Sequence, residues 1–211
     1  LLTYTVSGDP NKKKSFEILK AISSHADICE IGVGHNCNTG DGKQIQNSTY
    51  RAIKNGIKIK DTFTIVKKFK KTKKNRYVTF TFDDGFINSA KKIDSILDPY
   101  KATFYVVPGW VSPNSEPIKD EWNIGFDHGS LEDWRSIAKN GHDIGSHTFT
   151  HPDTKYKGIS REHLEQECSE SLKFIKQIDQ SHYSLAFPYN RGTLTSSIKK
   201  NYDSVRAGWG E

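Results

Sequence analysis

Two adjacent carboxylates, Asp83 and Asp84, follow an apolar β-rich run and precede Gly85. Active sites of parallel barrels gather where strands end, and a glycine there lets the chain turn so that both carboxylates can face one site. Such a pair can supply a metal ligand and a proton acceptor for hydrolysis. The structural alternative is a loop-start cap, in which one aspartate accepts backbone N–H groups.

Two histidines, His147 and His151, follow another β-rich run at a spacing of four residues. If a helical turn begins at Ser146, both imidazoles lie on one face and can coordinate one metal ion. Two histidines and a carboxylate form the three-ligand arrangement of catalytic sites, which leaves positions for water and substrate. A histidine pair can also be structural. His142, which precedes the strand, is expected at the surface.

These residues carry a resemblance to a known family. Residues 81–85 (Thr-Phe-Asp-Asp-Gly) and 147–152 (His-Thr-Phe-Thr-His-Pro) resemble the first two motifs of the polysaccharide deacetylases, carbohydrate esterase family 4. Residues 186–189 (Ala-Phe-Pro-Tyr) resemble the third motif. The resemblance covers residues 77–211 and implies a hydrolase that removes acetyl groups from N-acetylated glycans.

The resemblance also implies a role for each matching residue. Asp83 would be the general base, and the backbone amide of Tyr189 would contribute to the oxyanion site. The ligands of zinc or a similar divalent ion would be Asp84, His147 and His151.

The third motif departs from the family pattern. Ala186 stands where the family usually has an arginine that steadies the base, so another group must orient Asp83. The late histidine that serves the family as general acid is not visible, which leaves His35 and His128 as alternative proton donors. We therefore expect metal binding but slow hydrolysis.

Residues 1–74 resemble the first two βα units of the tryptophan synthase alpha subunit, on segments 4–10, 26–32 and 51–56. That resemblance implies that Glu30 and Asp41 correspond to the acid–base pair that cleaves indole-glycerol phosphate. The loop at 34–39 departs from the family pattern, so we interpret the pair as relics. The alternatives to a deacetylase are a tryptophan synthase alpha-like lyase fragment and an inactive chimeric barrel scaffold.

The elements that position these residues alternate between β-rich runs and helical stripes, which predicts an α/β fold with parallel strands. Seven runs favour a (β/α) TIM-like barrel, distorted or composite. We expect one composite domain over 1–211, with a tryptophan-synthase-alpha-like part (1–74) and a deacetylase-like part (75–211), over two domains joined at 70–76. The predicted strands are 2–6, 28–33, 77–82, 102–107, 143–146, 184–187 and 203–206.

Helical periodicity predicts amphipathic helices between the strands. Ser130 and Asp133 have capping-box spacing, and Cys168 lies in the apolar stripe of a helix that begins near Ser160. Residues 108–128 are expected to form a long functional loop. The other stripes are Phe16, Leu19 and Ile22; Ile45, Tyr50 and Ile53; Phe63, Val66 and Phe69; and Ile93, Ile96 and Leu97.

Composition excludes several classes of protein. The chain is 34% hydrophobic and 27% charged, with no apolar run near the ~18 residues of a membrane span. The net charge of +6 owes much to the basic stretch 67–76, which favours a solvated helix end over a nucleic-acid site. Three cysteines without a CxxC spacing indicate neither a disulfide framework nor a thiolate zinc site. No signal-peptide pattern is visible, which favours a cytoplasmic location.

Overall fold

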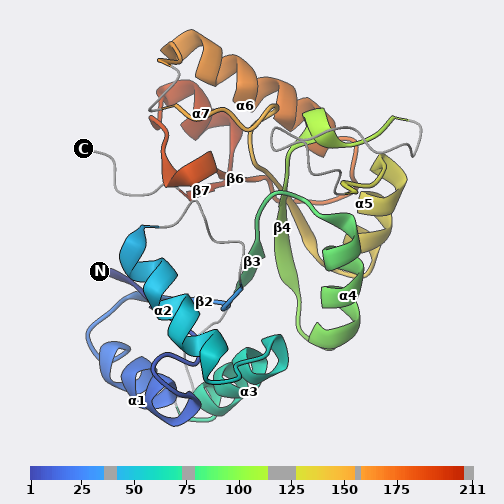
Figure 1. Cartoon of the computed structure of the whole chain (residues 1–211). Helices are drawn as coiled ribbons and strands as arrows, with labels where there is room; N and C mark the ends of the chain where they lie inside the picture. Colours follow the sequence, from blue (N-terminus) through green and yellow to red (C-terminus); the bar gives the residue numbers. More distant parts are fainter. Residues whose placement is uncertain (36–41, 73–78, 114–126, 155–157, 207–211) are drawn as a thin grey trace. The chain divides into compact units, whose positions relative to one another are not determined.

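The computed structural model describes residues 1–35, 42–72, 79–113, 127–154 and 158–206, which fall into two compact units, Leu1–Val78 and Thr79–Glu211 (Figure 1). Both units are built from parallel strands and helices, so the predicted α/β class is confirmed. Among the described helices, none combines the length and the apolar character that crossing a bilayer requires.

The first unit contains two parallel strands, β1 (Leu2–Val6) and β2 (Ile28–Gly32), paired so that Tyr4 lies opposite Glu30. Its core forms where Leu19, Ile65 and Phe69 bury their side chains against each other. Its helices are α1 (Lys12–Ile22), α2 (Lys43–Lys54) and α3 (Ile59–Lys70).

One expected core face in this unit is wrong. Tyr50 on α2 is 67% exposed, and the residues that α2 buries are Thr49 and Ala52. Small side chains let the helix approach its neighbours closely: a Cβ at Gly34 would lie 3.8 Å from that of Ala52. The larger Tyr50 therefore lies outside the contact.

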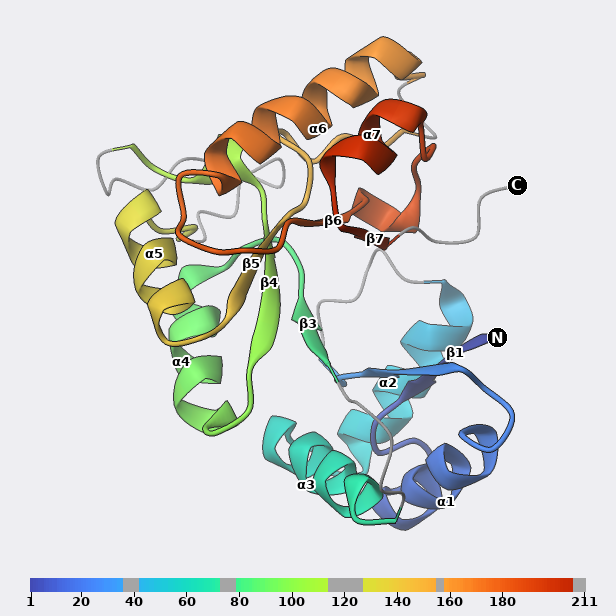
Figure 2. The ribbon, with the colours of Figure 1, turned by 180° about the vertical axis from the view of Figure 1, so that it is seen from behind.

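The second unit is a five-stranded parallel sheet in chain order (Figure 2). Its outer strands are β3 and β7, yet Arg206 on β7 donates a 3.1 Å hydrogen bond to Thr81 on β3. The sheet must therefore curl until its two edges approach each other, as in part of a barrel. The strands are β3 (Phe80–Phe82), β4 (Ala102–Val106), β5 (Asp143–Ser146), β6 (Ser184–Ala186) and β7 (Ser204–Arg206).

Helices cover this sheet, with α4 packed beside α5 and α6 beside α7 (Figure 1). The Ser130 side chain caps α5 and forms a capping box with Asp133, as predicted. Short 3₁₀ turns follow β4 (Pro108–Trp110) and β6 (Pro188–Asn190). The helices are α4 (Ile87–Leu97), α5 (Leu131–Lys139), α6 (Arg161–Ile175) and α7 (Ser196–Asn201).

Cys168 is a core residue, as predicted, and packs with Leu172 and Leu185. Its burial raises the pKa of the thiol to about 12. His142, expected at the surface, is instead buried, because its ring fits between the start of β4 and α4. Its Nδ1 accepts a 3.0 Å hydrogen bond from the Ala102 amide, and its Nε2 lies 2.9 Å from Asp94.

Candidate metal centre

Asp84, His147 and His151 converge at the carboxyl ends of β3 and β5, with one possible ligand atom from each within 4.8 Å of the others. Asp84 Oδ1 lies 3.4 Å from His147 Nε2 and 3.3 Å from His151 Nε2. Two ligands about 2.1 Å from a tetrahedral zinc ion lie about 3.4 Å apart. Both spacings therefore fit a small tetrahedral ion, and the donor set suits zinc.

The backbone fixes the orientation of the His147 ring. Its Nδ1 lies 2.7 Å from the carbonyl oxygen of Ala186, which can only accept a hydrogen bond, so Nδ1 carries the proton. The lone pair is thereby placed on Nε2, the atom that faces Asp84. A ring held through its second nitrogen in this way is typical of metal-binding histidines.

The backbone that brings His151 to the site differs from the expected helical turn. No helical turn begins at Ser146, because residues 147–150 are irregular. Thr148 and His151 instead have left-handed backbone, with φ of 65° and 60°, which folds the loop back toward β3. The spacing of four residues brought the imidazoles together, but through a loop and not through a helix face.

Glu167 on α6 holds this loop through hydrogen bonds, and sequence analysis did not single it out. Its side chain is 7% exposed and accepts hydrogen bonds from the Phe149 amide at 2.9 Å and the Thr150 amide at 2.7 Å. It also accepts from the Thr150 hydroxyl at 2.8 Å. One signal was available, since an acidic residue falls within the inward-facing stripe of α6.

His128 anchors the turn that carries Asp84. Its buried ring places Nδ1 3.0 Å from the Asp84 carbonyl oxygen and 3.2 Å from that of Gly85. Its own carbonyl accepts a 2.9 Å hydrogen bond from the Trp134 indole. His128 therefore acts on the site through the backbone of the aspartate loop.

Left-handed backbone is concentrated at this centre. Within the described ranges, the non-glycine residues with positive φ are Asp84, Thr148, His151, Tyr189 and Asn190, with φ between 54° and 70°. All of them lie in the three loops that follow β3, β5 and β6. Left-handed conformations are unfavourable for such residues, and strain of this kind clusters at functional sites.

Electrostatics keep Asp84 ionised. Burial raises its pKa, but hydrogen bonds and positive charge from His147 and His151 outweigh burial and hold the pKa well below its usual range. The carboxylate of Asp84 is therefore ionised, as a metal ligand must be.

Aromatic rings border His151. Trp110, which lies 5.1 Å from it between ring centroids, comes from the turn after β4, and sequence reasoning did not single it out. Tyr189 lies 5.0 Å away on the other motif loop. The predicted long loop 108–128 thus contributes Trp110 and His128, whereas its residues 114–126 lie outside the described residues.

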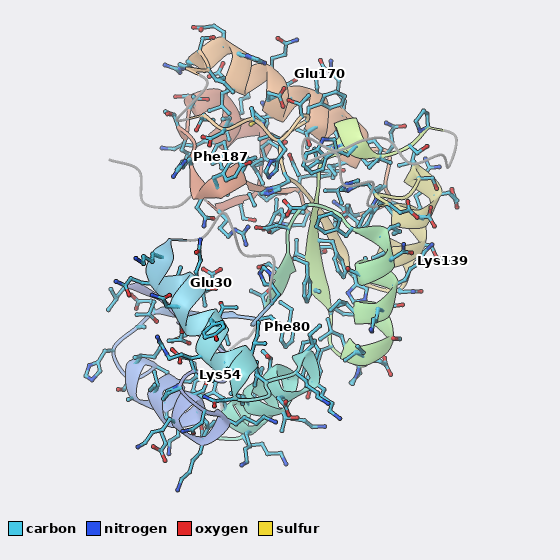
Figure 3. All side chains as sticks on the ribbon, in the orientation of Figure 1. Glu30, Lys54, Phe80, Lys139, Glu170 and Phe187 are labelled. Carbon is cyan, nitrogen blue, oxygen red and sulfur yellow. The ribbon has the colours of Figure 1, made fainter. Side chains whose placement is uncertain are left out.

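Asp83 points to a different partner from Asp84. It is exposed, and its carboxylate accepts a charged hydrogen bond from the Arg206 guanidinium. The two neighbours are thus separated in role by their surroundings. Glu30 belongs to the first unit, half-buried on β2 and labelled in Figure 3, while Asp41 lies outside the described residues.

Comparison with known proteins divides the chain close to the boundary between the two compact units, Val78 and Thr79. A polysaccharide deacetylase family model matches residues 70–205, and a tryptophan synthase alpha chain model matches residues 1–83. The tryptophan synthase alpha chain of Pelagibacter ubique is 57% identical over 102 residues, covering 44% of this chain and 38% of the relative. That of Thermococcus kodakarensis is 37% identical over 82 residues, covering 39% and 33%.

This chain therefore spans only about a third to two fifths of these curated relatives. A solved mutant tryptophan synthase alpha-subunit from Pyrococcus furiosus matches all of this chain and 78% of its own, with a TM-score of 0.55 and 19% identity. That likeness concerns the fold alone and agrees with a (β/α) barrel class. Because the deacetylase model matches well over half of the sequence, including all three site loops, the chain belongs to the polysaccharide deacetylase family.

Proposed function

We propose that this chain is a metal-dependent hydrolase that removes acetyl groups from N-acetylated glycans. The observation that carries the proposal is the cluster of Asp84, His147 and His151, in which Asp84 Oδ1 lies from each histidine Nε2 at the spacing of two ligands on a tetrahedral ion. Three protein ligands leave a position for water and substrate, as in catalytic zinc sites.

Asp84, His147 and His151 would hold the ion. A divalent ion bound there supplies two effects: it polarises the acetyl carbonyl, and it lowers the pKa of a bound water from ~16 toward ~7. The buried ring of Trp110 would border the ion on the His151 side.

Asp83 would accept the proton of the attacking water. It adjoins Asp84 in the sequence but lies outside the ligand cluster, and its carboxylate is 38% exposed, so it remains accessible. The Tyr189 amide would donate to the oxyanion that develops on the carbonyl, because its loop borders His151.

The leaving amine also needs a proton, and no described residue is an evident donor. His128 is engaged through Nδ1 with the carbonyls of Asp84 and Gly85. General acid assistance is typically worth ~10²–10⁴-fold in rate. We therefore propose slow hydrolysis of activated acetyl esters, whose leaving groups need little protonation, and little hydrolysis of acetamides.

The test is acetate release by one zinc-loaded sample from p-nitrophenyl acetate and from N-acetylglucosamine oligomers. We expect ester turnover that disappears with a chelator and in His147→Ala, together with weak amide turnover. No chelator-sensitive turnover of either substrate would refute the hydrolase. Robust amide turnover would refute the incomplete proton relay.

A second candidate, a tryptophan synthase alpha-like lyase, is favoured by the 57% identity over the front of the chain. The loop at 34–39 departs from the tryptophan synthase pattern, and the match covers 38% of that relative, so we propose that Glu30 and Asp41 are relics within a scaffold. The chain should form no indole from indole-glycerol phosphate. Glu30→Gln should leave acetate release unchanged.

A further inference from the structure

Arg206, at the end of β7, contacts the predicted base although no motif includes it. Its Nη2 donates to the Asp83 carboxylate, and its Nη1 donates to the Thr81 hydroxyl at 3.1 Å. The guanidinium thus binds both Asp83 itself and Thr81, on the strand β3 that leads into Asp83. Since these two bonds leave from different nitrogens, they fix the plane of the guanidinium as well as its position.

A ring supports the guanidinium. Arg206 Cζ lies 5.0 Å from the centroid of the Tyr105 ring on β4, within the range of a cation–π contact. Gly145 on β5 makes room for that ring, because a Cβ there would lie 2.5 Å from Tyr105 Cδ1. Tyr105 also lies 6.4 Å from the His147 ring, so one aromatic side chain separates the guanidinium from a metal ligand.

The pairing of β6 with β7 relates Arg206 to the third motif. In the parallel register, Ala186 and Arg206 are Cα partners. Ala186 is fully buried, and its carbonyl oxygen binds His147 Nδ1. Paired residues of neighbouring strands project to the same face of a sheet. The Arg206 side chain therefore lies on the same face and in the same register as Ala186, whose side chain is only a methyl group.

We propose that Arg206 is the positioning residue for Asp83 and that it replaces, from the neighbouring strand, an arginine at position 186. This inference rests on the proposed function, because it assigns a purpose to the Asp83 carboxylate. A partly exposed ion pair of this kind contributes modestly to stability. A misplaced base costs much more in rate, up to ~10²-fold for a displacement of about 1 Å.

The kinetic test compares Arg206→Ala with Arg206→Lys, using p-nitrophenyl acetate and zinc-loaded protein. Arg206→Ala should lower kcat by about 10- to 100-fold, leave KM little changed and retain its zinc. Lysine should recover part of the loss. Arg161→Ala is the matched control, since Arg161 pairs with Glu165 on the surface of α6 and should leave kcat unchanged.

Chemical rescue separates positioning from a structural role. Ethylguanidinium at sub-denaturing concentration should raise the kcat of Arg206→Ala, while leaving the wild type and Arg161→Ala unaffected. A lost fold would not respond to a small cation. If Arg206→Ala keeps wild-type kcat, or loses kcat together with its zinc, the assignment is overturned.

A thermal double-mutant cycle on Arg206→Ala and Asp83→Ala decides the pairing independently of turnover. At low ionic strength, the combined loss of Tm should be smaller than the sum of the single losses, because each single change already removes the contact. Additive losses would overturn the pairing. If the cycle shows coupling but the wild-type protein turns over no acetyl substrate, the hydrolase proposal fails while the Arg206–Asp83 pairing stands.

Discussion

Asp83 and Asp84 are chemically identical neighbours, and their surroundings separate them. Asp84 turns inward to two imidazoles through a left-handed backbone, whereas Asp83 stays exposed and meets a guanidinium. Two carboxylates in unlike environments can take unlike roles, one as metal ligand and one as proton acceptor.

Asp83→Asn should retain zinc and lose acetate release, because the amide preserves shape but accepts no proton. Asp84→Asn should instead lose zinc affinity, because an anionic ligand is replaced by a neutral one. Zinc raises the Tm of any variant that binds it in the folded state. Differential scanning fluorimetry with and without zinc, beside acetate release, measures both effects.

Equal loss of the zinc-induced Tm shift in both variants would contradict this division of roles. Retention of acetate release in Asp83→Asn would remove Asp83 as the base. A shift that survives Asp84→Asn but not Asp83→Asn would reverse the two assignments.

At the scale of elements, α6 sets the geometry of the histidine loop. Glu167 accepts two backbone amides and one hydroxyl from residues 149 and 150, between the two histidines. Hydrogen bonds that hold the loops of a metal site usually affect metal affinity as well as the stability of the fold. The left-handed Thr148 and His151 depend on it, because their strain must be offset by contacts nearby.

Glu167→Gln should weaken zinc binding by about 10- to 100-fold, since the side chain loses its negative charge and the carboxamide NH₂ cannot accept the hydrogen bond that the Thr150 hydroxyl donates. The free energy of unfolding should fall by about 1–3 kcal/mol, because hydrogen bonds to a charged carboxylate are replaced by weaker neutral ones. The matched control is Glu170→Gln on the same helix, labelled in Figure 3, whose partner is the exposed Lys173.

Competition of Glu167→Gln and of Glu170→Gln with a zinc indicator dye measures the zinc affinity of each variant. Equal affinities in Glu167→Gln and Glu170→Gln would show that the loop holds its shape without the buried carboxylate. Weaker binding in both would point to the general charge of α6 as the cause.

A second link between elements joins α4 to the start of β5. Asp94 accepts hydrogen bonds from His142 Nε2 at 2.9 Å and from the Asn140 amide at 2.8 Å. The hydrogen bond from His142 lowers the pKa of Asp94 below its ordinary value of 3.8. A lowered folded-state pKa adds stability above the unfolded-state pKa, and that stability disappears as the pH falls through the folded-state value.

Asp94→Ala should therefore lower the free energy of unfolding by about 1–3 kcal/mol at neutral pH, because the buried His142 N–H loses its acceptor. The difference from wild type should shrink once the pH falls below 3.8, where Asp94 begins to be protonated in the unfolded chain. Urea unfolding of both proteins across this range measures it. A difference independent of pH would contradict the ionic pairing.

Sequence patterns predicted the elements and the motif residues better than the loop conformations and long-range contacts that bring those residues together. Strands β1 and β5 have the predicted bounds, because a turn residue lies close to each of them, Gly8 after β1 and Gly141 before β5. The helix α7 was not predicted, since its six residues offer too little periodicity. The metal cluster was foreseeable from spacing, but Arg206 was not, because its contact with Asp83 joins residues 123 positions apart.

In the whole molecule, the described residues of the first unit form a two-stranded sheet beside three helices. Two strands alone are marginal in water, and open edges invite association. We propose that both units belong to one composite barrel domain that folds cooperatively. All tryptophans, Trp110, Trp122, Trp134 and Trp209, belong to the second unit, so their fluorescence reports on that unit.

Urea unfolding followed by tryptophan fluorescence and by far-UV circular dichroism should give coincident transitions. Circular dichroism includes α1, α2 and α3 of the first unit, so independent unfolding would split its curve from the fluorescence curve. Separated midpoints would contradict a single composite domain and favour two joined at residues 70–76.

The zinc content of the purified protein decides whether Asp84, His147 and His151 form a metal centre. Purified chain, reconstituted with zinc and dialysed, should contain about one zinc ion per chain by elemental analysis, because three ligands define one site. His147→Ala should contain markedly less under the same dialysis. No zinc in the wild-type chain, or the same zinc content in His147→Ala, would contradict the assignment of Asp84, His147 and His151 as a metal centre.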